Sequence, residues 1–192
     1  LSMKYAALIG DIVESRNYQD RLLVQKLLKS SLNLLNEWFL ESINKQMVIS
    51  SGDEMQGLFK ETYASYMYYR LLKMLLFPVK IRAGISFDEL DYKMDWDSNE
   101  LDGPVYRNAK NAVMFCKENN FKVIINSNNP NDKYVNMLLN LTNHIGKSNT
   151  ITINLIQLFS ELLFPLNPNI NISNIELLKK IIEYKINIYN LE

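Results

Sequence analysis

Hydrophobic residues along the chain follow two spacings, and the change from one to the other predicts an alternation of strands and helices. Continuous apolar runs and strict alternation predict strands, because successive side chains of a strand point to opposite faces. Apolar residues three and four positions apart predict helices. The segments predicted in this way are a strand at 5–10, a helix from about 20 to 43, strands at 47–50 and 55–59, a helix at 63–77 and a strand at 79–87.

This order, βαββαβ, predicts an α+β fold of the ferredoxin-like type, an antiparallel sheet with helices packed on one face. Asp20 and Thr62 precede the two helices and are predicted to cap them, because a side-chain oxygen there accepts from a free backbone N–H. Pro78 is predicted to close the second helix. In this topology the first and third strands are neighbours at the centre, so the end of the first lies beside the start of the third.

The second half of the chain is predicted to be mostly helical. A third helix begins at Pro104 after Asp102 and Gly103, a fifth strand follows at 121–125, and helices are predicted at 132–144, 150–166 and 173–189. We therefore expect a sheet domain at 3–127 and an all-helical C-terminal extension at 131–192. The acidic segment 88–102 lacks the regular ligand spacing of an EF-hand and is predicted to be a solvated loop rather than a second metal site.

Composition narrows the classes of protein. The hydrophobic fraction of 47% and the charged fraction of 22% are those of an ordinary globular chain. Lys plus Arg equals Asp plus Glu at 21 each, so no basic field favours nucleic acid as a partner. The single cysteine, Cys116, excludes an internal disulfide framework, and the single histidine, His144, excludes a Cys/His zinc site.

No apolar run approaches the roughly 20 residues needed to span a bilayer. The start of the chain has no basic leader followed by an apolar stretch, so no signal peptide is expected. We expect a cytoplasmic protein without a membrane partner.

Two acidic positions carry the candidate chemistry. Asp53 and Glu54 follow Gly52 between two short strands, which predicts a β-hairpin with an acidic turn. An ordinary hairpin turn accounts for these residues equally well when they are taken alone. Asp11, however, ends the first strand, and the predicted topology brings it to the same end of the sheet as Asp53. Two carboxylates at adjoining strand ends suit Mg²⁺ or Mn²⁺ held together with substrate phosphates.

Four stretches together resemble the SatD family of bacterial cytoplasmic proteins. They are LIGDIVESR at 8–16, SGDEMQGL at 51–58, VKIRAGI at 79–85 and DGPVY at 102–106. The resemblance covers roughly residues 3–126. Through this family the chain is also similar to the class III nucleotidyl cyclases and GGDEF diguanylate cyclases, in which two acids bind two metal ions over a nucleoside triphosphate.

The cyclase resemblance implies roles for ten residues. Asp11 and Asp53 take the metal positions, and Glu54 corresponds to the second acid of the GGDEF turn. The backbone N–H groups that would approach the triphosphate belong to Ile12, Val13, Glu14, Ser15 and Arg16.

The last two of these residues, Arg107 and Asn111, occupy the register where the cyclases have an Asn and, four residues later, an Arg that neutralise the departing pyrophosphate. The two residue types are exchanged here, so we expect turnover by the isolated protein to be weak or absent. An exposed helix residue is an equal alternative for Arg107.

Three functions remain open from the sequence. We favour a cyclase-like domain that binds a nucleotide with a divalent metal, with its catalysis unresolved. A catalytically silent regulatory domain and a DNA-binding regulator that uses the C-terminal helices as a degenerate helix-turn-helix are the alternatives. The last helix has Lys179, Lys180 and Lys185 beside acidic residues. Because contacts of basic residues with phosphates dominate DNA affinity, we expect this helix to bind DNA weakly. These helices are expected to pack on the sheet or to pair with another subunit in a homodimer.

Overall fold

The computed structural model describes residues 3–90, 103–145, 149–167 and 169–191. In these parts of the chain it contains five strands and six helices. The acidic segment predicted as a loop falls mostly at 91–102, outside the described residues. The elements are β1 (Lys4–Ile12), α1 (Arg21–Trp38), β2 (Ile43–Ser51), β3 (Glu54–Phe59), α2 (Thr62–Leu76), β4 (Ile81–Glu89), α3 (Pro104–Asn119), β5 (Val123–Ile125), α4 (Asp132–Ile145), α5 (Ile151–Leu163) and α6 (Ile175–Leu191).

The five strands form one sheet in the order β2-β3-β1-β4-β5. β1 runs antiparallel to both β3 and β4, whereas β5 runs parallel to β4 at the edge. The first four strands have the predicted ferredoxin-like order, with β1 and β3 as neighbours near the centre. The α+β prediction is therefore confirmed, and the short fifth strand makes the sheet mixed.

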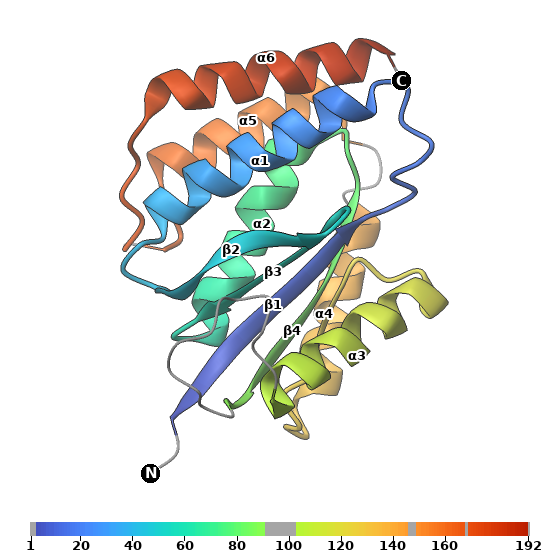
Figure 1. Cartoon of the computed structure of the whole chain (residues 1–192), viewed down its shortest axis with the longest axis vertical. Helices are drawn as coiled ribbons and strands as arrows, with labels where there is room; N and C mark the ends of the chain where they lie inside the picture. The colour runs from blue at the N-terminus through green and yellow to red at the C-terminus, as the bar shows by residue number, and fades with distance from the viewer. Residues whose placement is uncertain (1–2, 91–102, 146–148, 168, 192) are drawn as a thin grey trace.

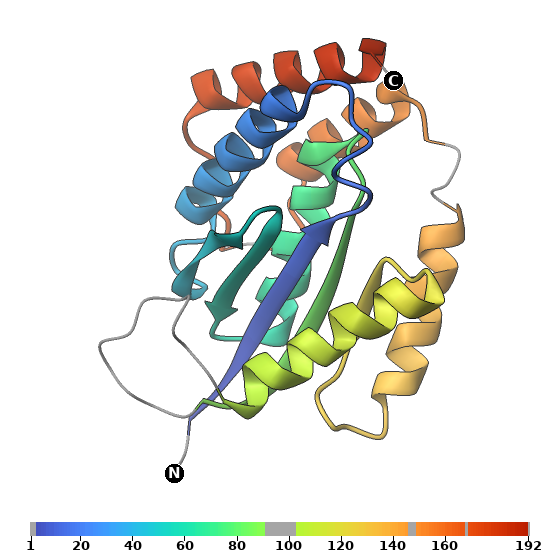
Figure 2. The ribbon, with the colours of Figure 1, turned by 45° about the vertical axis from the view of Figure 1, so that its right-hand side comes forward.

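Helices cover both faces of this sheet, because the alternating residues of β1 enter two different cores. Ala6, Leu8 and Ile12 join the main core beneath α1 and α2. Tyr5 and Ile9 point the other way and join a smaller core with residues of α3. Figures 1 and 2 show α3 across the sheet from α1 and α2. The expectation of helices on one face holds for the βαββαβ unit, and α3, which follows that unit, covers the second face.

α3 lies against β4 with almost nothing between the two backbones. A Cβ atom built on Gly84 would stand 2.2 Å from the carbonyl oxygen of Ala109 and 2.7 Å from the backbone nitrogen of Val113. The helix runs antiparallel to the strand. Ser86 Oγ donates to the carbonyl of Val105 near the start of the helix, and Cys116 near its end lies 3.4 Å from the carbonyl of Ala83. Burial raises the pKa of the Cys116 thiol to about 12.

Two of the predicted helix boundaries are corrected. Asp20 caps α1 as predicted, since its Oδ1 accepts from the backbone N–H of Leu23 at 2.9 Å. α1 ends at Trp38 rather than near 43, because Ile43 already belongs to β2. Thr62 is the first residue of α2 and not its cap; the capping position is Glu61, whose side chain makes no cap hydrogen bond.

The C-terminal helices share the main core with the sheet. Leu158 of α5 and Ile181 and Ile188 of α6 are buried in it. Trp38 joins α1 to this region, because its Nε1–H donates to the carbonyl of Ser173 at 2.9 Å. α5 and α6 pack on α1 and α2 rather than directly on the sheet, because those two helices already cover that face. Pairing with another subunit and the boundary predicted between 127 and 131 stay predictions.

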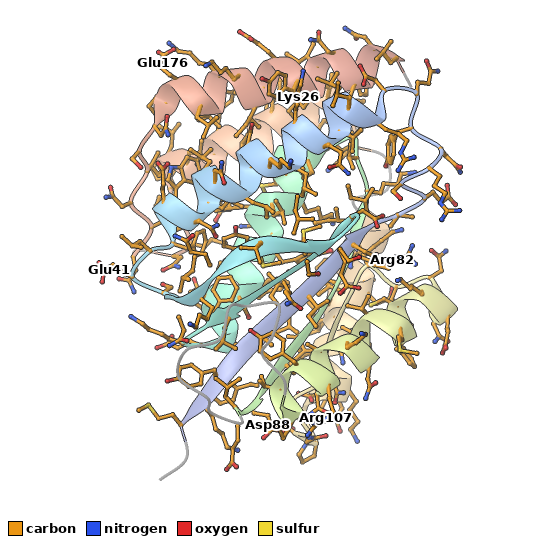
Figure 3. The ribbon with its side chains drawn as sticks, in the orientation of Figure 1. Lys26, Glu41, Arg82, Asp88, Arg107 and Glu176 are labelled. Carbon is orange, nitrogen blue, oxygen red and sulfur yellow. The ribbon has the colours of Figure 1, made fainter. Side chains whose placement is uncertain are left out.

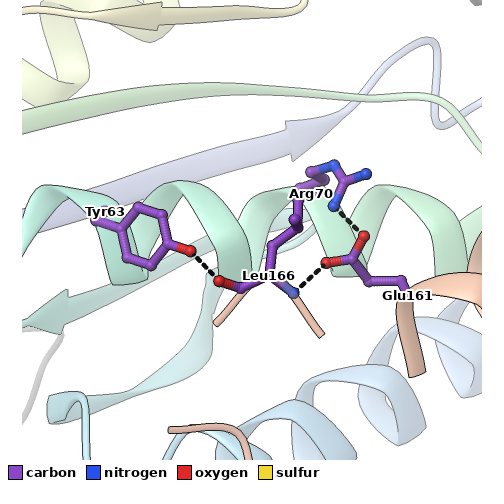
Figure 4. A network of polar contacts seen from close by, with 4 residues as sticks. All are labelled: Tyr63, Arg70, Glu161 and Leu166. Atoms are coloured by element: carbon purple, nitrogen blue, oxygen red, sulfur yellow. Dashed lines mark hydrogen bonds and ion pairs between the residues drawn. The ribbon is translucent and has the colours of Figure 1, made fainter. Parts of the chain in front are cut away.

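Polar contacts fix α5 to α2 (Figure 4). Arg70 of α2 donates to Oε2 of the buried Glu161, and Oε1 of the same carboxylate accepts from the backbone N–H of Leu166 at 3.2 Å. Tyr63 donates its hydroxyl to the carbonyl of Leu166. The loop after α5 is therefore held at both its N–H and its C=O.

Lys185 of α6 is buried among the same helices. Its Nζ donates to the carbonyl of Met74 at 2.7 Å and to Oδ1 of Asn154. Burial lowers the pKa of this lysine to about 7. Across the described residues, no helix combines the length and the apolar character needed to cross a membrane.

Candidate functional site

The acidic residues gather where β1 ends, beside the β2–β3 hairpin. Asp11 pairs across the sheet with Glu54 of β3 on one side and with Arg82 of β4 on the other. Its position in the alternation of β1 puts its side chain on the face covered by α3. Residues directly opposite each other in an antiparallel pair share a face, so Glu54 and Arg82 flank Asp11 on that face. Ser50 Oγ donates to Oε1 of Glu54 at 3.3 Å.

Asp11 is buried and lies between two cations. Arg82 Nε is 2.8 Å from Oδ1, and Lys117 Nζ of α3 is 2.6 Å from Oδ2. The Asp11 side chain is 8% exposed, whereas that of Lys117 is 48% exposed. Two positive charges therefore face one carboxylate in a largely dry position, where electrostatic interactions are stronger than in water.

The pair formed by Asp11 and Arg82 is close but not hydrogen bonded. Oδ1 of Asp11 and Nε of Arg82 are both buried, and neither has a hydrogen-bond partner, although they lie 2.8 Å apart. The N–H is therefore not directed at the carboxylate oxygen. Two neutral hydroxyls, on Ser31 and Tyr106, are also buried without a partner. The charged pair is the costlier condition, because an unmet hydrogen bond on a charged group costs more than one on a neutral group.

The hairpin turn meets the loop that follows β1. Gly52 has a φ of +59°, which a glycine adopts without strain, and it turns the chain so that Asp53 follows at the tip. A pocket of about 200 Å³ lies between this turn, the loop and the first turns of α1. Its lining residues are Ile12, Ser15, Arg16, Arg21, Val24, Gln25, Gly52 and Asp53.

The loop after β1 brings part of the predicted phosphate-binding backbone to this pocket. Ile12, Ser15 and Arg16 line it, whereas Val13 and Glu14 are not among the lining residues. The N–H of Val13 donates to the carbonyl of Lys80 at 2.8 Å and is already used. Glu14 has a φ of 52° and forms the tight bend of the loop. Asp53 and the loop thus meet at one pocket. Asp11 is not among its lining residues, because its side chain lies on the face covered by α3, so a shared position of the Asp11 and Asp53 carboxylates stays a prediction.

Arg107 and Asn111 are not brought to the acids. α3 runs antiparallel to β4, so its last turn, with Lys117, lies at Asp11, and Arg107 lies ten residues back, or about 15 Å of helix rise. Figure 3 shows Arg107 beside Asp88 at one end of the sheet and Arg82 toward the other. Asn111 lines a different cavity, between α3 and α4. A cation from this helix near the acids was expected, but the residue that supplies it is Lys117.

Sequence reasoning missed Arg82 and Lys117 as partners of Asp11. A signal for Arg82 existed, because it alternates with the apolar residues of the predicted strand at 79–87 and therefore had to lie on the opposite face. Lys117 had no comparable signal, since its position depends on which sheet face α3 covers and in which direction.

The donor set fits a hard divalent cation in part. Among the described residues, no three His, Cys, Asp or Glu side chains form a group that could hold a metal ion by themselves. Asp11, Asp53 and Glu54 offer carboxylate oxygens at one end of the sheet, and Oδ1 of Asp11 is buried without a hydrogen bond. Mg²⁺ is usually held by one or two carboxylates, with water and substrate phosphates completing its shell. These residues therefore suit a metal that arrives with a phosphate ligand.

Comparison with known proteins identifies one family. The model of the SatD family matches residues 5–186, which is most of the chain and more than the stretch that carried the resemblance. A search of curated proteins found no match.

Among solved structures, two of a bacterial light-regulated adenylyl cyclase match at 10% and 11% identity with TM-scores of 0.45 and 0.46. Each match covers 65% of this chain, and 43% and 76% of those chains respectively. The guanylyl cyclase Cya2 matches at 9% identity and a TM-score of 0.39, over 58% of this chain and 70% of that one. The chain spans less than half the length of the first of these proteins, and a likeness at these scores says nothing about activity.

Proposed function

The chain belongs to the SatD family, and from this premise we propose that it binds a nucleoside triphosphate together with Mg²⁺ or Mn²⁺ where β1 meets the β2–β3 turn. One observation carries the proposal. Oδ1 of Asp11 and Nε of Arg82 are buried 2.8 Å apart without a hydrogen bond. The two charges compensate each other, but a buried polar atom without an aimed hydrogen bond still costs stability, and a ligand that meets both atoms would remove this cost.

Each residue has a role in this proposal that follows from its chemistry. Asp11 and Asp53 would supply metal ligands, with Glu54 beside them. The bound metal would neutralise part of the phosphate charge. Arg16 and Arg21 line the pocket next to Asp53 and are suited to phosphate oxygens, because guanidinium groups bind such oxygens in pairs. Ser15, from the loop after β1, also lines this pocket.

Binding and turnover separate in this proposal. Catalysis needs donors placed where charge develops, and removing one of them typically lowers the rate about 10²–10³-fold. Arg107 and Asn111 lie away from Asp11, so they do not supply such donors to this site. Lys117 and Arg82 are closer, but both face Asp11. We therefore expect binding with little or no turnover by the isolated chain.

A catalytically silent domain is the second candidate, and a specific observation favours it. Arg82 and Lys117 together neutralise Asp11 without any ligand, which is also how a purely structural carboxylate is held. DNA binding through the C-terminal helices has no such support. Lys185 is buried, and Lys179 is paired with Glu176 at 2.8 Å.

Thermal unfolding with and without ligand tests the proposal. MgATP, MgGTP and their Mn²⁺ forms should raise the melting temperature, since a ligand at a hundredfold excess over its Kd stabilises the fold by about 2.7 kcal/mol. Asp53→Asn should abolish this shift. Asp88→Asn, at the opposite end of the same sheet, is the matched control and should retain it. Equal shifts for all three proteins, or none for the wild type, would contradict nucleotide binding at this site.

A second assay separates binding from turnover. Protein that gives the thermal shift is incubated with ATP or GTP and Mn²⁺, and the products are separated by chromatography. We expect no accumulation of cyclic mononucleotide or dinucleotide above the Asp53→Asn background. Robust product that disappears in Asp53→Asn would establish an enzyme and reject the silent-domain candidate.

A further inference from the structure

α4 carries apolar residues on two opposite faces. Its inner face lies on the edge of the sheet, where the side-chain amide of Asn136 exchanges two 2.8 Å hydrogen bonds with the backbone of Ile125. Leu139 from the same face is buried in the main core. The outer face presents four large side chains, which we call the α4 stripe: Tyr134 (56% exposed), Met137 (64%), Leu138 (57%) and Leu141 (58%).

The spacing of the α4 stripe is that of a helix-packing surface. Its residues stand at positions i, i+3, i+4 and i+7, so they form one continuous row along the helix. α4 packs on the remainder of its own chain through its inner face. The stripe is therefore a second apolar face, available to another helix.

The area of the stripe matches the apolar part of an ordinary protein interface. From the exposed fractions, the four side chains present roughly 450 Å² of apolar surface, which is in the range of about 300–600 Å² for the largest patch on a monomer. An interface of standard size buries about 800 Å² per partner, of which about 57% is non-polar, or roughly 450 Å². One copy of the stripe thus supplies the apolar surface that one side of such an interface needs.

The same surface continues onto α3. Met137 also lines the cavity of about 700 Å³ between α3 and α4. The opposite wall of that cavity includes Phe115, which is 45% exposed and stacks on Phe121 with 5.7 Å between ring centroids. A molecule packed on the stripe would extend over the mouth of this cavity and cover Phe115 as well.

The charge pattern of α4 identifies the occupant. From 134 to 145 the helix has no Asp, Glu, Lys or Arg, and the residue before this segment, Lys133, lies over the ring of Tyr134 with its Nζ 4.8 Å from the centroid. A partner selected by charge would find little to pair with here. A second copy of the stripe is equally neutral, has the same spacing and meets no like charge in its centre.

We propose that the α4 stripe is a homodimer interface, in which α4 of one copy packs antiparallel against α4 of a second copy. A twofold axis near Met137 and Leu138 makes the surface complementary to itself, because these two residues then lie near their own copies and Tyr134 of each copy faces Leu141 of the other. The inference is independent of nucleotide binding.

The oligomeric state tests this interface. Light scattering after size exclusion, at about 1–100 µM, should give a dimer for the wild type and a monomer for Leu138→Glu, which buries an unpaired charge at the centre. The dimer should weaken about a hundredfold or more. Leu163→Glu, on the exposed face of α5 (74% exposed), is the matched control and should leave the dimer intact. Circular dichroism and thermal melting verify that each variant is folded.

Cysteine cross-linking locates the axis. Leu138→Cys or Met137→Cys should form disulfide-linked dimers on mild oxidation, because residues at the twofold axis lie close to their own copies, whereas Leu163→Cys should not. The native Cys116 is buried and gives little background. The proposal is overturned by a wild type that stays monomeric at 100 µM, by a dimer that persists in Leu138→Glu, or by a dimer that Leu163→Glu dissociates.

Discussion

The buried polar groups beneath the C-terminal helices and those at the end of β1 differ in their hydrogen bonding. Beneath the C-terminal helices, both carboxylate oxygens of Glu161 accept hydrogen bonds, and Lys185 donates to two oxygens. At the end of β1, Asp11 has a cation at each oxygen, yet its Oδ1 lacks a hydrogen bond. The hydrogen bonds of Glu161 and Lys185 are thus met within the chain, whereas Oδ1 of Asp11 can still accept one.

The difference separates structural polar groups from candidate binding groups. A buried polar network that only supports the fold gains by satisfying each of its atoms, since each unsatisfied one costs stability. A binding site keeps groups for a ligand and tolerates that cost when the ligand is away. If this distinction holds, substitutions beneath the C-terminal helices should mainly lower stability, and substitutions at Asp11 should mainly change ligand binding.

The largest effect is expected from Glu161→Ala. It leaves Arg70 without its carboxylate and the N–H of Leu166 without its acceptor, and removing one partner of a buried pair typically costs about 3 kcal/mol. Urea unfolding measures the loss. Glu176→Ala, which breaks an exposed pair with Lys179, is the control and should cost less than about 0.5 kcal/mol. Similar losses in both variants would mean that the buried contacts of Glu161 contribute little to the stability of the fold.

The next effect is a dependence on pH from Lys185. Burial lowers its pKa to about 7, whereas an unfolded lysine holds its proton up to about pH 10.4. Between these values the unfolded chain binds more protons, so this lysine makes stability rise with pH, by at most about 1.4 kcal/mol per pH unit. Below pH 7 its contribution is flat. Lys185→Met should remove the rise in urea titrations from pH 6 to 9.5. The exposed Lys180→Met should keep it, and parallel curves for all three proteins would refute the assignment.

A smaller effect on stability, with a large one on binding, is expected from Asp11→Asn. Lys117 is half exposed and can turn to water, and an Asn side chain keeps an oxygen for the buried Arg82 to face, so we expect a loss of about 1 kcal/mol, well below that of Glu161→Ala. The same variant should lose the nucleotide-dependent thermal shift. A loss of stability as large as that of Glu161→Ala, with the shift retained, would make Asp11 a structural residue and reverse the contrast between the clusters.

The smallest effect is expected from Lys117→Ala. The ammonium group competes with a metal ion for Oδ2 of Asp11, so its removal should tighten the binding of Mg²⁺ alone by about threefold, the scale of a weak exposed ion pair. Isothermal titration measures the change. Lys110→Ala, another exposed lysine of α3, should leave Mg²⁺ binding as in the wild type. Weaker Mg²⁺ binding in Lys117→Ala would show that the lysine supports the metal site.

Much of the sheet was predictable, because periodicity and topology act together. Alternating residues defined the strands, and the ferredoxin-like order then placed Asp11 beside the hairpin without any distance information. The cap at Asp20 followed from local chemistry. The end of α1 did not, because the apolar spacing of the helix runs into the alternating pattern of β2 near Ile43.

The partners of Asp11 needed tertiary information that periodicity lacks. Apolar spacing shows which side of α3 is buried, but not which face of the sheet it covers or in which direction it runs. Arg107 was assigned from its distance after Gly103, and the antiparallel course of α3 over β4 puts Lys117 at Asp11 instead. The unsatisfied contact between Asp11 and Arg82 depends on an angle between side chains, which no pattern of residues predicts.

The close approach of α3 to β4 at Gly84 fixes the position of α3, and with it the position of Lys117 at the site. With no side chain between strand and helix, the height of α3 above the sheet is set by backbone touching backbone, and α3 carries Lys117 to Asp11. The methyl group of Gly84→Ala would push α3 away from the sheet, tilt the helix and move its last turn. The alignment of charges at Asp11 is therefore adjustable from the middle of the sheet, by an uncharged substitution that touches none of them.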